Sequence, residues 1–267
     1  MTILYLGDIM GRPGRQLVKD WLPGLRRDYG VDFVVAQGEN LSHGKGMSIA
    51  HAQDMMEAGV DFFTGGDWTL HKAEIHPWLD DPAKPVIRPA NYPDGTPGRG
   101  YKIVDTPQGK ILVASLLGQT VGYRAPTGLQ NPLHPIDRIL EDTKREKLIA
   151  RIVNFHGDFS SEKVVIGQYL DGRVTAIIGD HWHVPTADSR VLPGGTAHIT
   201  DVGMVGSRDS SLGIKTDVIV KRWLSDDQSR NELETDGRMW LCGLLIAVNG
   251  ASGRANTVEQ IIKFGEF

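Results

Sequence analysis

Eight polar residues stand where short apolar, strand-like runs give way to turns, and their side chains carry oxygen or nitrogen atoms of the kind that bind metal ions. The runs include ILYLGD at the N-terminus and AIIGDHWH in the second half of the chain. In open α/β sheets the functional crevice lies beyond the carboxyl ends of the strands, so these side chains would meet there. The residues are Asp8, Glu39, Asn40, Asp67, His156, Asp180, His181 and His183. Their types and places predict a metal-dependent enzyme.

The pair formed by His181 and His183 strengthens this interpretation. Only Trp182 separates them, so an extended backbone would point both imidazoles to the same side and the indole to the other. Taken singly, an acid at a strand end more often caps a helix, and a buried histidine is usually a satisfied core residue. A His-x-His pair together with a third histidine and separate acid positions outweighs those structural explanations.

The ligand types narrow the choice of metal and reaction. Carboxylate, amide and imidazole groups without a thiolate favour Mn or Fe, with Zn or Mg as alternatives. The candidate ligands outnumber the needs of one tetrahedral ion, which favours two divalent ions that share a bridging carboxylate. Two ions ~4 Å apart can hold the attacking and leaving oxygens of a phosphoryl transfer and generate hydroxide near neutral pH. The predicted reaction class is phosphoester hydrolysis.

Composition limits the partners and the location. The chain has 267 residues, 40% hydrophobic content, a formal net charge of −4 and a pI near 6.1. We expect one domain over residues 1–267 and no binding of long nucleic acid, so that a nucleotide substrate would be small. No run approaches the ~20 apolar residues of a membrane span, and no export signal is visible at the N-terminus. These features predict a cytoplasmic protein that does not contact a membrane.

The first half of the chain alternates strand and helix signals. An apolar stripe over residues 17–25 predicts a helix after the first strand, and Ser48 is placed to cap a second helix that runs towards Ala58. FFTGGD reads as the third strand, and a helix is expected over residues 72–79. This order is a βαβαβ opening.

In the second half of the chain, the strand and helix signals no longer alternate regularly. YKIVDT and ILVASLLG read as a hairpin, followed by a helix over residues 136–148, a strand into His156 and a helix after Ser160. Later runs at 196–202 and 239–248 suggest a second sheet that is largely antiparallel. Two sheets with helices on both outer faces predict a four-layer α-β-β-α sandwich of the α/β class.

Long, ordered motifs make the sequence resemble a known family almost from end to end. The motifs are GDIMGRPGR, GENLSHGKGM, RPANYPDGTPGRG, NFHGDFSSEK, IGDHWHVPTAD and LPGGTAHITDVGM. They resemble those of the calcineurin-like metallophosphoesterases, and within these the bacterial YmdB-like cyclic-nucleotide phosphodiesterases. The resemblance implies the metallophosphoesterase fold, two metal ions and a homo-oligomer.

The resemblance also implies roles for individual residues. Asp8 and His183 would hold one metal ion, and Glu39 would bridge the two. Asp67, His156 and His181 would hold the second ion. Asn40 would lie beside the bridging solvent and the phosphate, as a catalytic and substrate-binding residue.

The chain departs from the family pattern at two places. The family has Gly-Asn-His at the third strand end, where its histidine acts near the leaving group; here Gly66, Asp67 and Trp68 stand there. Asp67 can still coordinate a metal ion, but Trp68 cannot transfer a proton at physiological pH. At the second place, Asp180 precedes the paired histidines where the family usually has a threonine.

Two further residues are candidates for a part in the reaction. His71, three residues beyond Trp68, is the candidate for the missing proton donor. Lys45, in the glycine-rich loop SHGKG, could contact a substrate phosphate, although the loop lacks the P-loop pattern and is equally a tight turn.

The sequence thus favours a phosphodiesterase that hydrolyses small 2′,3′- or 3′,5′-cyclic nucleotides. One alternative is a catalytically weakened regulator that binds a nucleotide or a protein partner, because Trp68 occupies the place of the catalytic histidine. Another is a phosphomonoesterase or a nuclease, which would use the same metal ions.

Overall fold

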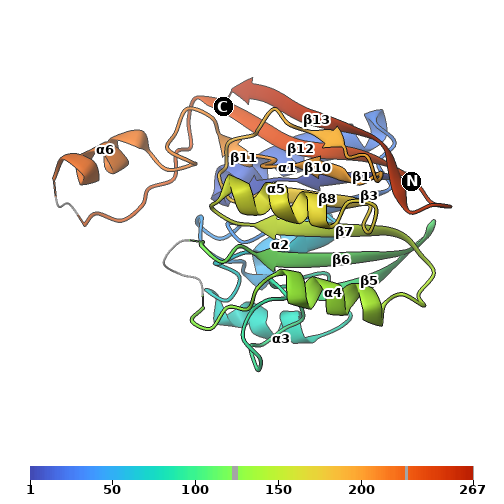
Figure 1. The fold of residues 1–267 in the computed structure, drawn as a ribbon. Helices are drawn as coiled ribbons and strands as arrows, with labels where there is room; N and C mark the ends of the chain where they lie inside the picture. The colour runs from blue at the N-terminus through green and yellow to red at the C-terminus, as the bar shows by residue number, and fades with distance from the viewer. Residues whose placement is uncertain (122–125, 226–227, 267) are drawn as a thin grey trace.

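The computed structural model describes residues 1–121, 126–225 and 228–266, which fold into two face-to-face β-sheets with helices outside them (Figure 1). One apolar cluster, which includes Tyr5 and Ile152, fills the space between the sheets. A second packs the first sheet against the helices that contain Leu17 and Met55, and a third packs the other sheet against the helix that contains Ile136. The four-layer α-β-β-α sandwich is confirmed.

The first sheet combines parallel strands from the beginning of the chain with antiparallel strands from its end. Within the described residues its strands are β1 (Thr2–Leu6), β2 (Asp8–Ile9), β3 (Phe33–Gln37), β4 (Phe62–Thr64), β11 (Met204–Ser207), β12 (Arg238–Asn249) and β13 (Arg254–Glu266). β1, β3 and β4 run parallel, and β12 lies antiparallel to β1, β11 and β13. In the βαβαβ opening, helices α1 (Gly11–Asp28) and α2 (Ile49–Glu57) connect the parallel strands.

The second sheet is mainly parallel, whereas the sequence predicted a largely antiparallel sheet. In the described part of the chain its order is β5 (Tyr101–Thr106), β6 (Gly109–Leu117), β7 (Leu148–His156), β8 (Ala176–Asp180), β10 (Ala197–Ile199) and β9 (Arg190–Val191). β6, β7, β8 and β10 run parallel, and only the edge strands β5 and β9 pair antiparallel. The prediction of a largely antiparallel second sheet is therefore wrong. The crossover helices α4 (Leu133–Asp142) and α5 (Ser160–Tyr169) allow parallel pairing here, and the run at 239–248 joins the first sheet instead.

Local signals in the sequence explain most helices. Leu17, Val18, Leu22 and Leu25 form the buried face of α1, and the Ser48 Oγ caps α2 by accepting a hydrogen bond from the His51 backbone N–H at 3.2 Å. The helix expected over 72–79 is a 3₁₀ turn, η1 (Ala73–Ile75), followed by α3 (His76–Asp80).

The boundaries of two later helices follow from hydrogen bonds and from exposure. α4 (Leu133–Asp142) ends well before residue 148: the Lys144 N–H donates to the Glu141 carbonyl at 3.3 Å and the Glu146 N–H to the Thr143 carbonyl at 3.1 Å, which are turn hydrogen bonds, and the chain then enters β7. α5 (Ser160–Tyr169) begins where it was expected.

α6 (Thr216–Leu224) has no buried residue and projects from the body of the molecule in Figure 1. Among the described residues, no helix combines the length and apolar character needed to cross a membrane.

Candidate metal centre

Four of the predicted ligands converge at the carboxyl ends of β3, β4, β7 and β8. Ligand atoms of Glu39, Asp67, His156 and His181 all lie within 4.8 Å of one another. The His156 Nε2 lies 3.2 Å from the Glu39 Oε1 and 3.3 Å from the Asp67 Oδ1, and His156 and Glu39 are almost completely buried. A buried group of two carboxylates and two imidazoles is a suitable donor set for a divalent transition-metal ion.

Asp8, His183 and Asn40 flank this group. The His183 Nε2 lies 3.7 Å from the Asp8 Oδ1, and the His181 backbone N–H donates to the Asp8 Oδ2 at 3.3 Å. Among the described residues, the Asp8 Oδ1 and the Asn40 Oδ1 are buried and have no hydrogen-bond partner. Buried oxygens without a partner are costly unless a cation satisfies them, and the Asp8 Oδ1 also faces an imidazole nitrogen, so this side of the cluster fits a metal ion as well.

The two paired histidines reach different parts of the cluster. His181 and His183 have φ angles of 104° and 63°, and they form a turn after β8 rather than an extended strand. The prediction of an extended backbone at this pair is wrong, although both histidines line the same cavity. The left-handed turn sends the His181 ring to His156, with ring centroids 4.4 Å apart, and brings the His183 ring to Asp8.

In each of the three histidines of the cluster, one ring nitrogen contacts an oxygen acceptor that is not one of the candidate ligands. The His156 Nδ1 is 2.7 Å from the Asp180 Oδ1, the His183 Nδ1 donates to the Leu212 carbonyl at 3.1 Å, and the His181 Nε2 is 3.0 Å from the Asp158 Oδ1. Such contacts place the proton on the contacted nitrogen and leave the other nitrogen as a lone-pair donor. For His156 and His183 the remaining nitrogen is Nε2, which faces the carboxylates.

Asp180 supports the cluster and is not one of its converging ligands. Its carboxylate is fully buried and accepts hydrogen bonds from the Tyr5 hydroxyl at 2.8 Å, the Gln37 amide at 3.1 Å and the Asn154 amide at 2.6 Å, besides the contact with His156. With these donors in place, both oxygens are occupied. The sequence placed Asp180 among the residues of the metal crevice. The structure corrects this, because Asp180 lies behind His156 and contacts its Nδ1.

The electrostatics of the cluster favour a bound cation. Burial and the charge of Asp180 raise the pKa of Asp8 well above its ordinary value, and burial, with Asp67 adding to it, raises the pKa of Glu39 against the opposing effect of His156. Burial also lowers the pKa values of His181 and His183 to about 4. At neutral pH these two imidazoles are therefore uncharged, the form that binds metal.

The pKa values of His156 and Asp67 shift in a different way, because these two side chains contact each other. Burial acts to lower the pKa of His156, but Glu39 and the hydrogen bonds to Asp180 and Asp67 raise it well above its ordinary value. Burial acts to raise the pKa of Asp67, but the hydrogen bond to His156 and the charge of that ring lower the pKa of Asp67 below its ordinary value. In the absence of metal, the protonated imidazole is the cation of this cluster.

A glycine makes room for the cluster. A Cβ atom at Gly66 would lie 2.4 Å from both the Glu39 Oε2 and the His156 Cδ2, so no other residue fits without moving a ligand. The next residues of the same turn contribute the Asp67 carboxylate and the Trp68 backbone N–H, which donates to the Glu39 Oε2 at 3.1 Å. This turn therefore supplies one candidate ligand and orients another.

A cavity of about 430 Å³ opens onto the cluster. Glu39, Asn40, His181 and His183 form part of its wall, and Lys45, Trp68, Trp182, Leu212 and Ile219 are among the other lining residues. The Lys45 Nζ lies 5.2 Å from the centroid of the Trp68 ring, and the Asn40 Nδ2 donates to the Gly44 carbonyl at 3.0 Å. The cavity thus joins the candidate ligands to a cationic side chain and to an apolar wall.

His71 lies on the far side of Trp68. Its exposed ring packs edge-on against the Trp68 ring, with centroids 5.0 Å apart, and it is not one of the residues that line the cavity. Its role as proton donor stays a prediction.

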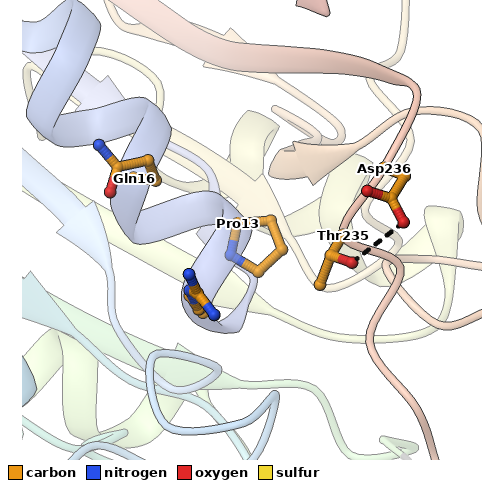
Figure 2. A pocket seen from close by; sticks show the side chains of 5 residues that line it. Pro13, Gln16, Thr235 and Asp236 are labelled. Carbon is orange, nitrogen blue, oxygen red and sulfur yellow. Dashed lines mark hydrogen bonds between the residues drawn. The ribbon is translucent and has the colours of Figure 1, made fainter. Parts of the chain in front are cut away.

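A second cavity, of about 330 Å³, lies at the start of α1. Figure 2 shows Pro13 and Gln16 on the helix and Thr235 and Asp236 on a separate segment, and Arg12 completes the lining. This lining includes none of the residues of the metal cluster. The chemistry is therefore concentrated in the first cavity.

Sequence analysis overlooked several residues that support the cluster. Asp158 contacts His181, Gln37 contacts Asp180, and the buried pair of Lys163 and Asp201 lies behind the His181–His183 turn. A polar Gln37 at the end of the otherwise apolar strand FVVAQ was the one visible signal. The other three lie in polar stretches where their burial could not be seen from the sequence.

Comparisons with known proteins agree with this arrangement. Residues 4–261 match the family described as YmdB-like protein. Over 263 residues the chain is 38% identical to the 2′,3′-cyclic-nucleotide 2′-phosphodiesterase of Bacillus subtilis (strain 168), a match that covers 98% of this chain and 97% of that protein.

Two crystal structures are similar along nearly the whole chain. A novel phosphatase from Mycoplasma pneumoniae superposes with a TM-score of 0.91 at 31% identity, covering 100% of this chain and 94% of the other. A hypothetical protein from Thermus thermophilus gives a TM-score of 0.88 at 33% identity, covering 99% of both chains.

Proposed function

Because the chain belongs to the YmdB-like protein family, we propose that it is a metal-dependent phosphodiesterase of small cyclic nucleotides. The relatives support the reaction class: one is named a 2′,3′-cyclic-nucleotide 2′-phosphodiesterase and another a phosphatase. The chain is accordingly a phosphoric ester hydrolase. The 2′,3′-cyclic nucleotides are the first substrates to test, with the 3′,5′ isomers second.

The observation that carries the proposal is the convergence of Glu39, Asp67, His156 and His181 within 4.8 Å, next to a cavity whose lining includes Glu39 and His181. In the proposed assignment, Asp67, His156 and His181 hold one ion, Asp8 and His183 hold another, and Glu39 bridges them. The orphaned oxygen of Asp8 supports the second ion. Mn or Fe fits this donor set best, with Zn or Mg as alternatives. When bound, such ions neutralise phosphoryl charge and lower the pKa of a coordinated water.

The chain's own residues would orient the phosphodiester in the cavity. Asn40 lines the cavity, its amide nitrogen is fixed by the Gly44 carbonyl, and its oxygen is buried without a hydrogen-bond partner among the described residues. Lys45 brings a positive charge to the rim, where it can contact a phosphate oxygen. The neutral imidazoles of His181 and His183 can act as ligands at physiological pH because burial keeps their pKa values near 4.

Trp68 limits proton transfer to the leaving group. Its indole lines the cavity at the place where the family has a histidine, and an indole N–H donates a hydrogen bond but does not titrate. We therefore expect slow turnover of esters with poor leaving groups, unless His71 supplies the proton. The same observation favours one alternative function, a catalytically weakened regulator that binds a nucleotide or a protein partner.

Three predictions from the sequence remain proposals. The first is a single domain over residues 1–267, and the second is a cytoplasmic location. The third is a homo-oligomer, which is supported by the exposed apolar side chains of α6, where Trp223 is 87% and Leu224 is 83% exposed. Sedimentation equilibrium of the full chain tests the oligomer directly.

A metal analysis coupled to a hydrolysis screen tests the proposed function. Protein purified with added Mn²⁺ would be assayed with 2′,3′- and 3′,5′-cyclic nucleotides, an aryl phosphodiester and an aryl phosphomonoester. Metal-dependent turnover of the diesters supports the proposal. Preference for the monoester favours a phosphomonoesterase, and metal or nucleotide binding without any turnover favours the regulator.

A further inference from the structure

An ion pair lies completely buried behind the turn that carries His181 and His183. The Lys163 Nζ on α5 is 2.7 Å from the Asp201 Oδ2, which follows β10, and neither side chain is exposed. Removing two charges from water is costly, and apolar residues of similar volume often stabilise a fold as well or better. Stability alone therefore does not explain this pair.

The lysine contacts the turn directly. Its ammonium donates to the Asp180 carbonyl at 2.8 Å and lies 4.0 Å from the centroid of the Trp182 ring. Asp180 is the last residue of β8, and Trp182 is the residue between the two histidines. Lys163 thus holds the turn both at its start and at its centre.

The aspartate joins this turn to the strand end that carries Asp8. The Asp201 Oδ2 accepts the Trp182 backbone N–H at 2.9 Å, and the Asp201 Oδ1 accepts the Gly203 N–H at 2.9 Å. The Gly203 carbonyl in turn accepts the Asp8 N–H at 3.2 Å. One carboxylate is therefore linked to candidate ligand segments from both sheets.

The turn needs such support because its backbone is unusual. Two histidines with φ angles of 104° and 63° occupy a region that residues with a Cβ rarely adopt, and such conformations persist only where the surroundings impose them. The same backbone directs His181 towards the Asp67 group and His183 towards Asp8.

We propose that Lys163 and Asp201 are positioning residues of the metal centre, which hold the His181–His183 turn and the Asp8 strand end in register for binding metal. The proposal rests on the proposed function of the cluster. Neither residue touches the cavity or needs to bind metal itself; both act through the backbone of the ligand segments.

The test replaces the pair without leaving a buried charge. Lys163→Met alone would strand the Asp201 carboxylate, so the decisive variant is Lys163→Met with Asp201→Leu, which removes both charges. The matched control is Arg26→Met with Asp61→Leu. That pair has a contact of 2.9 Å on the other side of the first sheet and bonds to none of the candidate ligands. Circular dichroism would verify that both double variants fold.

Two measurements test whether the pair positions the turn. In the metal-free protein, hydrogen exchange of the His181 amide, which donates to Asp8 and not to the pair, should become at least about 10-fold faster in the Lys163/Asp201 variant and not in the control. Calorimetric titration with Mn²⁺ should show an affinity loss of about 10- to 100-fold, the usual effect of losing support for a ligand. On an aryl phosphodiester, kcat should fall more than KM rises.

Unchanged His181 exchange and Mn²⁺ affinity in the folded double variant would overturn the proposal, as would an equal loss in the Arg26/Asp61 control. If the wild-type protein binds no Mn²⁺, the proposed function fails. The exchange measurement still decides whether the pair positions the turn.

Discussion

The His156 Nδ1 lies 2.7 Å from the Asp180 Oδ1, and both side chains are fully buried. Asp180 can only accept hydrogen bonds in its ionised form, so His156 must carry its proton on Nδ1 when it is neutral. Its Nε2 lone pair then faces Glu39 and Asp67. A carboxylate behind a ligating histidine both orients the ring and raises its basicity, which gives this contact a direct effect on metal affinity.

Asp180→Asn tests that relationship. The amide of an asparagine would donate to the His156 Nδ1 and move the ring proton to Nε2, which blocks the metal-facing nitrogen. We expect Mn²⁺ affinity to fall by about 10- to 100-fold. In the metal-free protein, histidine ¹⁵N chemical shifts recorded at a pH above the raised pKa of His156, where its ring is neutral, should report the change of tautomer. An unchanged tautomer and an unchanged affinity would show that Asp180 does not control His156.

Glu39→Ala tests the bridging carboxylate. Glu39 contacts His156 through one oxygen and the Trp68 N–H through the other, and it is 1% exposed. We expect elemental analysis to show less than about half of the wild-type metal content after purification with Mn²⁺, because both ions lose a shared ligand. The exposed Glu74→Ala variant is the control and should keep full metal content. Equal metal content in both variants would contradict the bridging role.

Trp68→His tests the missing proton donor. General acid assistance typically contributes 10²- to 10⁴-fold, and it matters most for poor leaving groups such as ribose alkoxides. The substitution should therefore raise kcat for cyclic nucleotides far more than kcat for an aryl phosphodiester. Rapid native turnover of cyclic nucleotides, with both substrates slowed alike by the substitution, would instead indicate another donor. His71→Ala would then be the next variant.

The metal-free protein should lose stability in mild acid through His183. Burial lowers the pKa of His183 to about 4, whereas an unfolded histidine titrates near ~6.5. Between these values the unfolded state binds a proton that the folded state does not, so this contribution is complete above pH ~6.5 and declines as the pH falls towards 4. In a chelator, the Tm of His183→Asn should fall less steeply across this range than the wild-type Tm. Parallel Tm profiles would show that His183 is not held neutral.

The strand ends that carry the metal centre were predictable because their signal is local. Asp8, Glu39, Asp67 and His156 each follow or end a short apolar run, and parallel strands bring such ends together. The left-handed turn of His181 and His183 was not predictable, because it depends on contacts with Lys163 and Asp201 from distant segments. The partners of Asp180 were hidden for the same reason, since Tyr5 lies 175 residues away from it in sequence.

The pairing of the late strands also needed tertiary information. An apolar run such as 239–248 has the same pattern in either sheet, and only its pairing with β1 places it in the first. After the end of α4 at Asp142 the backbone forms turn hydrogen bonds from Lys144 to Glu141 and from Glu146 to Thr143, which the apolar pattern does not reveal.

Crystallography at the Mn absorption edge would show whether the cluster binds two metal ions. Crystals grown with Mn²⁺ should show two anomalous peaks at the end of the sheets, one beside Asp8 and His183 and the other beside Asp67, His156 and His181. Both should lie within ~2.0–2.4 Å of their ligand atoms, with Glu39 between them. A single peak would show that the centre holds one ion instead of two. No peak at these residues, in protein shown to be folded and saturated with Mn²⁺, would contradict the metal centre itself.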